Sequence, residues 1–487
     1  MSARARFLIC LVVGVTAVLV ALFWSRLYLR EQPVSGDEPH YLVMTQSLVD
    51  DRDLELKDDY GQARYQAFYT GGTLNPHGHV VDPEPSNPTW HAIHGPGLPM
   101  LLAAPYALLG LDGVTLVMVL GALLVAYLSY RWVNRVTANR WAALGAAGVL
   151  FSSASFLSVS GTVYPDLPIA LLTVAGLLWL ESPSRSRWRL AGLGLLLGLA
   201  PWIHTKAALL VGTIVAIALW QLLRAARSKP CPPWRTTLGD VGLLLGPAAV
   251  LIALFEWKFA GWFGTLLPSQ VYQEQLFALS PLFSLPAMAF DATKGLFTNN
   301  PVFLLVFVGL PIWYRHNRGQ LGRVALIVLP TLLINATFGD WWGGYSPPGR
   351  YLMELLPAAL PAIGFALLPV MRGAATAQTI VPRVTAVIAG LLVAAQLWIT
   401  ATMIATNARW TLVTDSNPVF DTIRNYTPFE YATVIPKFGP EHLTVGADRW
   451  RLGLMLIVVV ALVWLGWRLA SDPATRRVRR SNHPSAR

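Results

Sequence analysis

Residues 7–24 read FLICLVVGVTAVLVALFW, a run of eighteen residues without a charge. A helix needs about 20 mostly apolar residues to cross a bilayer core, so this run predicts a membrane span. It ends at Trp24 and is followed by Arg26 and Arg30 rather than by a small-x-small cleavage site. We therefore predict an uncleaved first span and not a secretory signal peptide.

The same apolar pattern recurs along the whole chain. Of the 487 residues, 54% are hydrophobic and 13% are charged, and the mean hydropathy is +0.49. Soluble domains carry about 25% charged residues, so this composition predicts an all-α polytopic membrane protein. About twelve transmembrane helices are predicted, at 7–24, 113–130, 141–160, 166–181, 190–203, 207–223, 238–256, 300–314, 324–338, 352–371, 384–405 and 452–470.

The charges predict the orientation of these spans. Lys and Arg accumulate in short cytoplasmic loops. With the N-terminus inside, the inner segments hold 23 of the 37 Lys and Arg residues but only Asp240 and Asp472 among the 26 acids, with Glu181 at a span end. We predict a multi-pass protein of the inner (cytoplasmic) membrane with both termini in the cytoplasm. The net charge of +11 is dispersed over many loops, whereas nucleic-acid surfaces cluster their basic residues, so no nucleic-acid partner is predicted.

Three outer segments are long enough to form structure of their own. In the first, Tyr41, Met44, Leu48 and neighbouring apolar residues follow a helical spacing that predicts an interfacial helix. The apolar run 97–110 is too short to span and contains prolines, so a re-entrant or interfacial helix is predicted there. The predicted organisation is a first span at 1–24, an outer catalytic loop at 25–112, a bundle at 113–256, an outer loop at 257–299, a bundle at 300–405 with an outer motif at 339–350, an outer loop at 406–451, and a last span with a basic tail at 452–487.

Four short motifs lie on the predicted outer face. They are VSGDEPHY at 34–41, which carries Asp37 and Glu38, HGPGLP at 94–99, GLFTNNP at 295–301 and DWWGGYSPPGR at 340–350. An Asp-Glu pair early in the first outer loop of a many-span protein resembles the GT-C superfamily of polyprenyl-phosphate-sugar-dependent glycosyltransferases. Within it the chain is most similar to bacterial RgtA/B/C/D-type transferases and, more distantly, to protein O-mannosyltransferases and the lipid A aminoarabinose transferase.

The resemblance implies a GT-C-like fold and transfer of a sugar from a polyprenyl-phosphate donor to a glycan, lipid or protein acceptor. In such a reaction a carboxylate takes the proton of the acceptor hydroxyl, and we expect Asp37 to be that base. Glu38 is expected to orient the loop or a second ligand, because neighbouring helical residues do not face each other. The structural alternative is that both acids cap the surface helix.

The leaving phosphate requires a cation at the outer end of the bundle. Arg350 is the expected phosphate ligand, because its planar donor fork suits phosphate oxygens. Lys206, in the sequence PWIHTK at 201–206, is a second candidate. The alternatives are that Arg350 only anchors its helix at the interface and that Lys206 only extends to the membrane surface.

Other outer-face residues are candidates for binding the sugar or the acceptor. They are Trp341, Trp342 and Tyr345, with the interfacial aromatic belt as the alternative, and Asp166, His94 and Tyr41. The segment that reads Lys-Pro-Pro in aminoarabinose transferases reads His94-Gly95-Pro96 here. Contacts to the donor phosphate are therefore expected to differ.

No cofactor is predicted, and divalent-metal binding is kept as the weaker alternative. His77, His79, His91 and His94 lie near Asp82 and Glu84, but their spacing matches no fixed metal motif.

Two other functions are compatible with the chain. A polymer ligase would use Arg424 and His442 in the last outer loop. A transporter or flippase would show internal repeats and charges near the membrane midplane.

Overall fold

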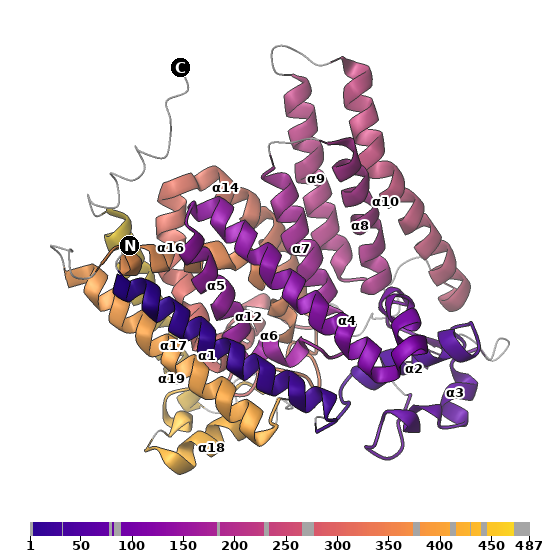
Figure 1. The fold of residues 1–487 in the computed structure, drawn as a ribbon, viewed down its shortest axis with the longest axis horizontal. Helices are drawn as coiled ribbons and strands as arrows, with labels where there is room; N and C mark the ends of the chain where they lie inside the picture. The colour runs from indigo at the N-terminus through magenta and orange to yellow at the C-terminus, as the bar shows by residue number, and fades with distance from the viewer. Residues whose placement is uncertain are drawn as a thin grey trace.

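The computed structural model describes most of the chain. The described residues are 3–31, 33–76, 80–81, 89–182, 186–227, 233–264, 277–373, 380–409, 415–428, 430–439 and 446–471. Helices dominate them, and the predicted all-α polytopic architecture is confirmed (Figure 1). The only strands in these ranges are β1 (Val80–Val81) and β2 (His91–Ala92), which pair antiparallel in the first outer segment.

All twelve predicted spans coincide with helices, but not one to one. Seven helices are long and apolar enough to cross a membrane, and shorter apolar helices lie between them. The helices that contain the predicted spans are α1 (Ala3–Tyr28), α4 (Gly97–Thr137), α5 (Arg140–Ser152), α6 (Ala154–Val159), α7 (Asp166–Leu180), α8 (Arg187–Ile203), α9 (Ala207–Ala226), α10 (Trp234–Phe263), α14 (Leu305–Thr337) with the short η2 (Pro301–Leu304) before it, α16 (Leu356–Gly373), α17 (Ile380–Thr406) and α19 (Gly446–Ser471).

Local breaks in the backbone lie at three places near predicted boundaries; two agree with the prediction and one divides a predicted span. Helix α4 is interrupted at the non-helical Gly110 (φ 59°, ψ −142°), so the run 97–110 forms a helix distinct from the next span, as predicted. The predicted span 141–160 is interrupted at Ser153, which is extended between α5 and α6. Spans 300–314 and 324–338 lie on the two arms of α14, which meet at Asn317 (φ −153°, ψ 86°). The break at Ser153 is not visible in the hydropathy, because the residues on both sides of it are mostly apolar.

Small residues allow the helices to approach closely. A Cβ added to Gly309 of α14 would lie 1.6 Å from the carbonyl oxygen of Ala362 in α16, and one added to Gly194 of α8 would lie 2.3 Å from that of Leu244 in α10. Such contacts are typical of membrane helices, where packing replaces the hydrophobic effect between them. The outer surfaces of α1, α4, α10, α17 and α19 expose many Leu and Val side chains, as expected for lipid-facing helices.

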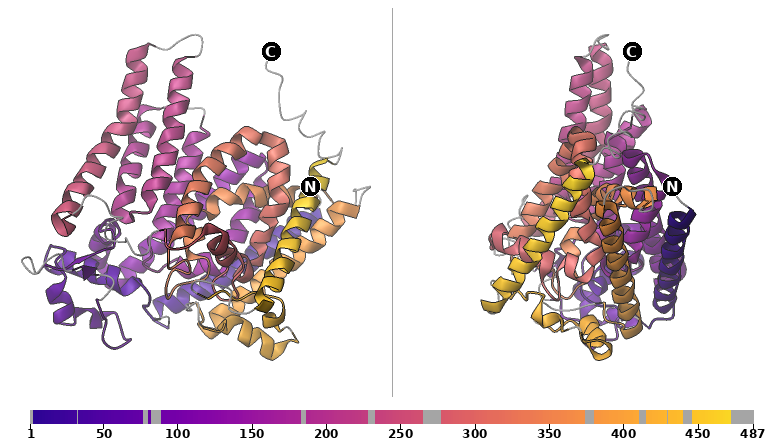
Figure 2. Two further views of the ribbon diagram at one scale, coloured as in Figure 1. Left: turned by 180° about the vertical axis from the view of Figure 1, so that it is seen from behind. Right: turned by 90° about the vertical axis from the view of Figure 1, so that its left-hand side faces the viewer.

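The outer segments gather at one end of the bundle. Helices α2 (Glu38–Asp50), α3 (Lys57–Gly61) and α18 (Pro418–Tyr426) lie there (Figure 1), whereas α9 and α10 project beyond the bundle at the opposite end (Figure 2). Helix α2 occupies the position predicted for an interfacial helix but is buried on most sides against α4. The remaining short elements at this end are η1 (Arg64–Ala67), α12 (Pro281–Phe290), α13 (Leu296–Asn299), α15 (Arg350–Met353) and η3 (Tyr431–Thr433).

Candidate active site

Charged side chains from four segments form a connected network at ends of the spans. Arg350 donates from Nη2 to Asp37 Oδ2 at 2.5 Å and from Nε to Asp166 Oδ2 at 3.4 Å. Lys206 Nζ lies 3.1 Å from the other oxygen of Asp166 and 3.4 Å from Oε2 of Glu354. The order Asp37–Arg350–Asp166–Lys206–Glu354 therefore alternates in sign, which offsets the cost of burying these charges.

Asp37 is the most accessible member of this network. Its side chain is 19% exposed, against 0% for Asp166 and 1% for Glu354. It stands at the N-cap position of α2, but its carboxylate makes no capping hydrogen bond and turns to Arg350. The structure therefore disfavours the capping alternative for Asp37.

The backbone before Asp37 is held against Tyr164, in the segment that precedes α7. Gly36 has φ +65°, and a Cβ there would meet the Tyr164 hydroxyl at 2.1 Å and the Tyr345 carbonyl oxygen at 2.5 Å. The Asp37 N–H donates to that same hydroxyl at 3.0 Å. Glycine is thus required at position 36 both for its conformation and for the close approach.

Glu38 lies in a different environment from Asp37. It is buried, and its Oε1 accepts a 2.9 Å hydrogen bond from the Val163 N–H. Burial raises the pKa of Glu38, while the positive charge of Arg409 opposes that shift. The two neighbouring acids thus point to separate partners, as expected for consecutive residues, and Glu38 links α2 to the segment before α7.

Arg350 is the centre of the site. It is 6% exposed, and its Nη1 donates to the Gly343 carbonyl oxygen at 3.0 Å while its guanidinium lies 4.7 Å from the centre of the Tyr164 ring. Gly349, in the left-handed conformation (φ +65°), begins α15 and directs Arg350 inward. The interfacial-anchor alternative predicts an exposed side chain, so the burial of Arg350 disfavours it.

Lys206 is likewise enclosed. Its side chain is 14% exposed, and its ammonium lies 4.8 Å from the centre of the Tyr351 ring. Burial alone would lower its pKa, but the carboxylates of Asp166 and Glu354 outweigh burial and raise the pKa above its ordinary value. The lysine is therefore a permanent cation beside Arg350 and does not extend to the membrane surface.

The predicted aromatic residues are placed unequally. Trp341 is 2% exposed and packs edge-on against Phe283 and Phe438, so in this structure it forms part of a core. Trp342 is half-buried beside it. Tyr345 is 43% exposed, which makes it the accessible aromatic of the 340–350 motif. Tyr41 is buried and stacks on His94 with ring centres 4.7 Å apart.

Several site residues were not identified from the sequence. His204 lies two residues before Lys206, and burial and that lysine hold its pKa well below the ordinary value. Its Nδ1 accepts the Lys206 N–H at 3.2 Å, which assigns the neutral ring's proton to Nε2. Glu354 and Lys294 are buried charges, and for Glu354 the available signal was a charge within an otherwise apolar run.

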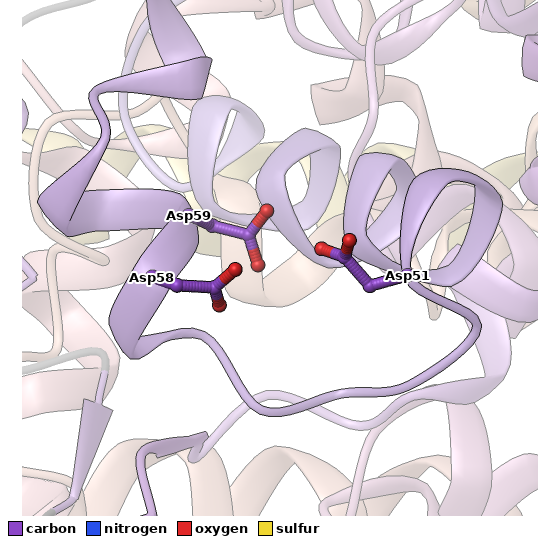
Figure 3. Close-up of side chains that lie close together, drawn as sticks. All are labelled: Asp51, Asp58 and Asp59. Carbon is purple, nitrogen blue, oxygen red and sulfur yellow. The ribbon is translucent and has the colours of Figure 1, made fainter.

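The described residues contain one group with metal-like spacing. The ligand atoms of Asp51, Asp58 and Asp59 lie within 4.8 Å of one another (Figure 3). Arg64 already pairs with all three, at 3.0 Å for Asp58 and 3.1 Å for Asp59. Burial, and next the charge of Asp58, raise the pKa of Asp59 to about 6. Arginine thus supplies the positive charge that a metal ion would otherwise bring.

The other predicted metal and ligase residues lie elsewhere. His91 bonds the Leu54 carbonyl oxygen through Nδ1 at 2.8 Å and stacks on Trp262. Arg424 forms an exposed 3.6 Å ion pair with Glu430. The remaining predicted residues, His77, His79, Asp82, Glu84 and His442, fall outside the described part of the chain.

Comparisons with known proteins identify the fold. No family model and no curated sequence matches the chain. Among solved structures, ArnT from Cupriavidus metallidurans bound to undecaprenyl phosphate superposes with a TM-score of 0.51 and 14% identity, over 95% of this chain and 78% of that one. Its apo form gives a TM-score of 0.45 over 96% and 77% of the chains at 14% identity.

An archaeal oligosaccharyltransferase, AglB from Archaeoglobus fulgidus in complex with an inhibitory peptide and a dolichol-phosphate, gives 0.37 at 12% identity over 99% of this chain and 59% of that one. Only the first of these similarities exceeds 0.5, and at 14% identity it concerns the fold. The predicted resemblance is thus confirmed at the level of the fold alone: this chain shares its fold with ArnT.

Proposed function

We propose that the chain is a membrane glycosyltransferase that moves a sugar from a polyprenyl-phosphate donor to an acceptor hydroxyl on the outer face of the cytoplasmic membrane. The observation that carries the proposal is the buried Asp37–Arg350–Asp166–Lys206–Glu354 network, in which Asp37 is the most exposed group. Strongly coupled ionisable groups at the mouth of a bundle are typical of active sites.

The network supplies the groups that the reaction needs. Asp37 accepts the proton as the acceptor oxygen forms its bond to the anomeric carbon. The bond from that carbon to the donor phosphate breaks, and its electron pair leaves with the phosphate, which Arg350 and Lys206 stabilise. A single displacement of this kind inverts the anomeric carbon. Arg350 exchanges its contact with Asp37 for the phosphate oxygens, which leaves the Asp37 carboxylate available to the acceptor.

An apolar cavity is available for the hydrocarbon chain of the donor. It has a volume of about 560 Å³ and is lined by residues of α17, α18, α19 and the segment 290–304, among them Phe297, Trp398 and Phe420. Its surface is almost entirely apolar. A hydrocarbon chain fits such a lining, whereas a sugar does not.

The aromatic residues beside the inner cations support the proposed orientation. Arginines pack over aromatic rings at the helix ends opposite the site, including Arg224 over Trp220, Arg235 over Trp234 and Arg315 over Trp467. Interfacial aromatics and cytoplasmic cations together are typical of the inner membrane boundary. We therefore propose that both termini are cytoplasmic and that the network faces outward.

Replacement of Asp37 by Asn tests the assignment of the base. With purified protein in lipid, a panel of radiolabelled polyprenyl-phosphate monosaccharides and membrane extract as acceptor, we expect D37N to lose about 10²–10⁴-fold in transfer. Asp112→Asn is the matched control, because Asp112 is 60% exposed in the same outer segment. Full transfer by D37N would exclude Asp37 as the base.

The same assay separates the alternative functions. A ligase that relies on the last outer loop would lose transfer in Arg424→Ala and retain it in D37N. No turnover with any donor in the wild type would favour the ligase or the transporter.

A further inference from the structure

Lys294 is a buried lysine that the proposed mechanism does not use. It lies between α12 and α13 in the second outer segment and is 1% exposed. Within the described ranges no carboxylate oxygen lies within 4.0 Å of its ammonium, in contrast to Lys206. Lysine is rarely fully buried without a charged partner, so its contacts require an explanation.

The Lys294 ammonium binds three oxygens of one turn. Nζ donates to the carbonyl oxygens of Gly344 at 2.9 Å and Ser346 at 2.8 Å, and lies 3.4 Å from the Ser346 hydroxyl. The backbone is tied to the same turn, because the Gly349 N–H donates to the Lys294 carbonyl oxygen at 2.8 Å. One residue thus contacts both ends of the segment 343–349.

That turn carries Arg350 into the site. Gly343, Gly344 and Gly349 all have left-handed φ angles, of +76°, +68° and +65°. Three such glycines in seven residues leave the unbound turn many conformations, so a specific fold there requires outside contacts. The Gly343 carbonyl oxygen accepts from Arg350 Nη1, which means that the path of the turn sets the position of the guanidinium.

Lys294 is itself held by a fixed frame. Oδ1 of Asp291 accepts the N–H groups of Thr293 at 2.8 Å and Lys294 at 2.7 Å, and Oδ2 accepts the Phe438 N–H at 2.8 Å. Both Asp291 and Lys294 are buried. The hydrogen bonds of Asp291 therefore join the second outer segment to the third. Lys294 connects both of them to the turn that holds Arg350.

We infer that Lys294 is a positioning residue, whose ammonium fixes the 343–349 turn so that Arg350 lies between Asp37 and Asp166. This inference rests on the proposed function, because it assigns Arg350 to the donor phosphate. The inference also gives a role to the GLFTNNP motif at 295–301, which directly follows Lys294: this segment supports the 343–349 turn.

The charge of Lys294 makes this support sensitive to pH. Burial, and next the nearby Arg350, lower the pKa of Lys294 to about 7, while Asp291 and Asp415 oppose the shift. Burial raises the pKa of Asp291 to about 6, so that acid is ionised where Lys294 titrates. Loss of the proton leaves two N–H donors for three oxygens, so turnover should fall as the pH rises through about 7.

The first test compares Lys294→Met with Lys294→Arg in the transfer assay. We expect K294M to lose about 10²-fold in kcat with a smaller change in KM, because a displacement of about 1 Å at a reacting group costs that much. K294R should restore part of kcat, and its activity should no longer fall near pH 7. Lys437→Met is the control, since that lysine also bonds a backbone carbonyl but is more exposed.

A second measurement does not depend on turnover. Hydrogen–deuterium exchange of the 340–350 backbone should accelerate in K294M and remain at the wild-type rate in K437M. If no donor is turned over by the wild type, the proposed function fails while the exchange result still decides the role of Lys294. Unchanged exchange together with an unchanged kcat in K294M would overturn the inference. If K294M does not fold, K294R decides the question: an activity that still falls near pH 7, as in the wild type, would overturn the inference.

Discussion

Two groups of acidic residues gather around an arginine in this molecule, and they are built differently. In the candidate active site, Arg350 pairs with Asp37 across 313 residues of sequence and with Asp166 across 184. In the first outer segment, Arg64 pairs with three aspartates at most 13 residues away. Arg350 is 6% exposed and Arg64 is 22% exposed.

These differences in sequence separation and burial distinguish the candidate active site around Arg350 from the surface cluster around Arg64. Burying charges from distant segments carries a desolvation cost that only well-ordered partners offset, so such a network is retained where its charges are used. The acids around Arg64 are neighbours along the chain, and two of them, Asp51 and Asp58, remain 30% and 43% exposed to water. Their contacts stabilise a loop and need no further function.

The largest expected effect comes from removing the central cation of the buried network. Arg350→Met leaves Asp37 and Asp166 without their shared partner, and breaking a buried pair in this way costs about 3–5 kcal/mol. We expect a clear fall in the thermal midpoint in detergent and transfer below detection. An unchanged midpoint would mean that water already screens these charges.

A smaller effect is expected when the middle carboxylate is neutralised. Asp166→Asn removes one of two acids from both Arg350 and Lys206, yet each cation keeps its other partner, Asp37 or Glu354. We expect a loss of about 1–3 kcal/mol in stability, typical of charged hydrogen bonds, and a weaker apparent affinity for the donor. Titration of the donor in the transfer assay measures the second effect, and equal KM values would contradict it.

The sequence identifies most residues of the candidate active site but not the contacts between them. Asp37 was identified from the family resemblance, and Asp166, Lys206 and Arg350 were identified because each lies at an end of a predicted span. Their pairing was not predictable, because contacts between residues 37 and 350 depend on how the spans pack. Glu354 was missed for the same reason, since it follows Arg350 in an apolar run and pairs with Lys206 from another helix.

The aromatic residues and the bends mark the other limits of sequence reasoning. Trp341 and Tyr345 share one motif, yet one ring is buried and the other exposed, because the glycine turn between them redirects the chain. The break at Ser153 divides a span predicted as continuous, whereas the breaks at Gly110 and Asn317 lie where the sequence prediction already separates two helices. The break at Ser153 depends on the backbone angles of one residue in a mostly apolar run, which hydropathy does not encode.

The surface cluster should respond weakly to the corresponding substitution. Arg64→Met removes the cation from Asp51 and Asp58, whose partly exposed ion pairs contribute about 0–1 kcal/mol each. It also removes the cation from the buried Asp59, whose raised pKa allows that acid to take up a proton instead. We expect a shift of the thermal midpoint much smaller than that of Arg350→Met and nearly unchanged transfer. A loss of transfer as large as that of Arg350→Met would show that the cluster belongs to the site.

The smallest expected effect is a pH dependence confined to this cluster. The pKa of Asp59 in the folded protein, about 6, lies above its ordinary value of 3.8. Between pH 3.8 and pH 6, therefore, Asp59 is protonated in the folded protein and ionised in the unfolded chain. Lowering the pH from 7 to 5 should therefore stabilise the loop, and raising it should remove that gain. Hydrogen–deuterium exchange of residues 51–67, corrected for intrinsic rates, should slow at pH 5 in the wild type. In Asp59→Asn, which cannot titrate, the corrected rates should be the same at both pH values, and a persistent difference would assign the effect to another group.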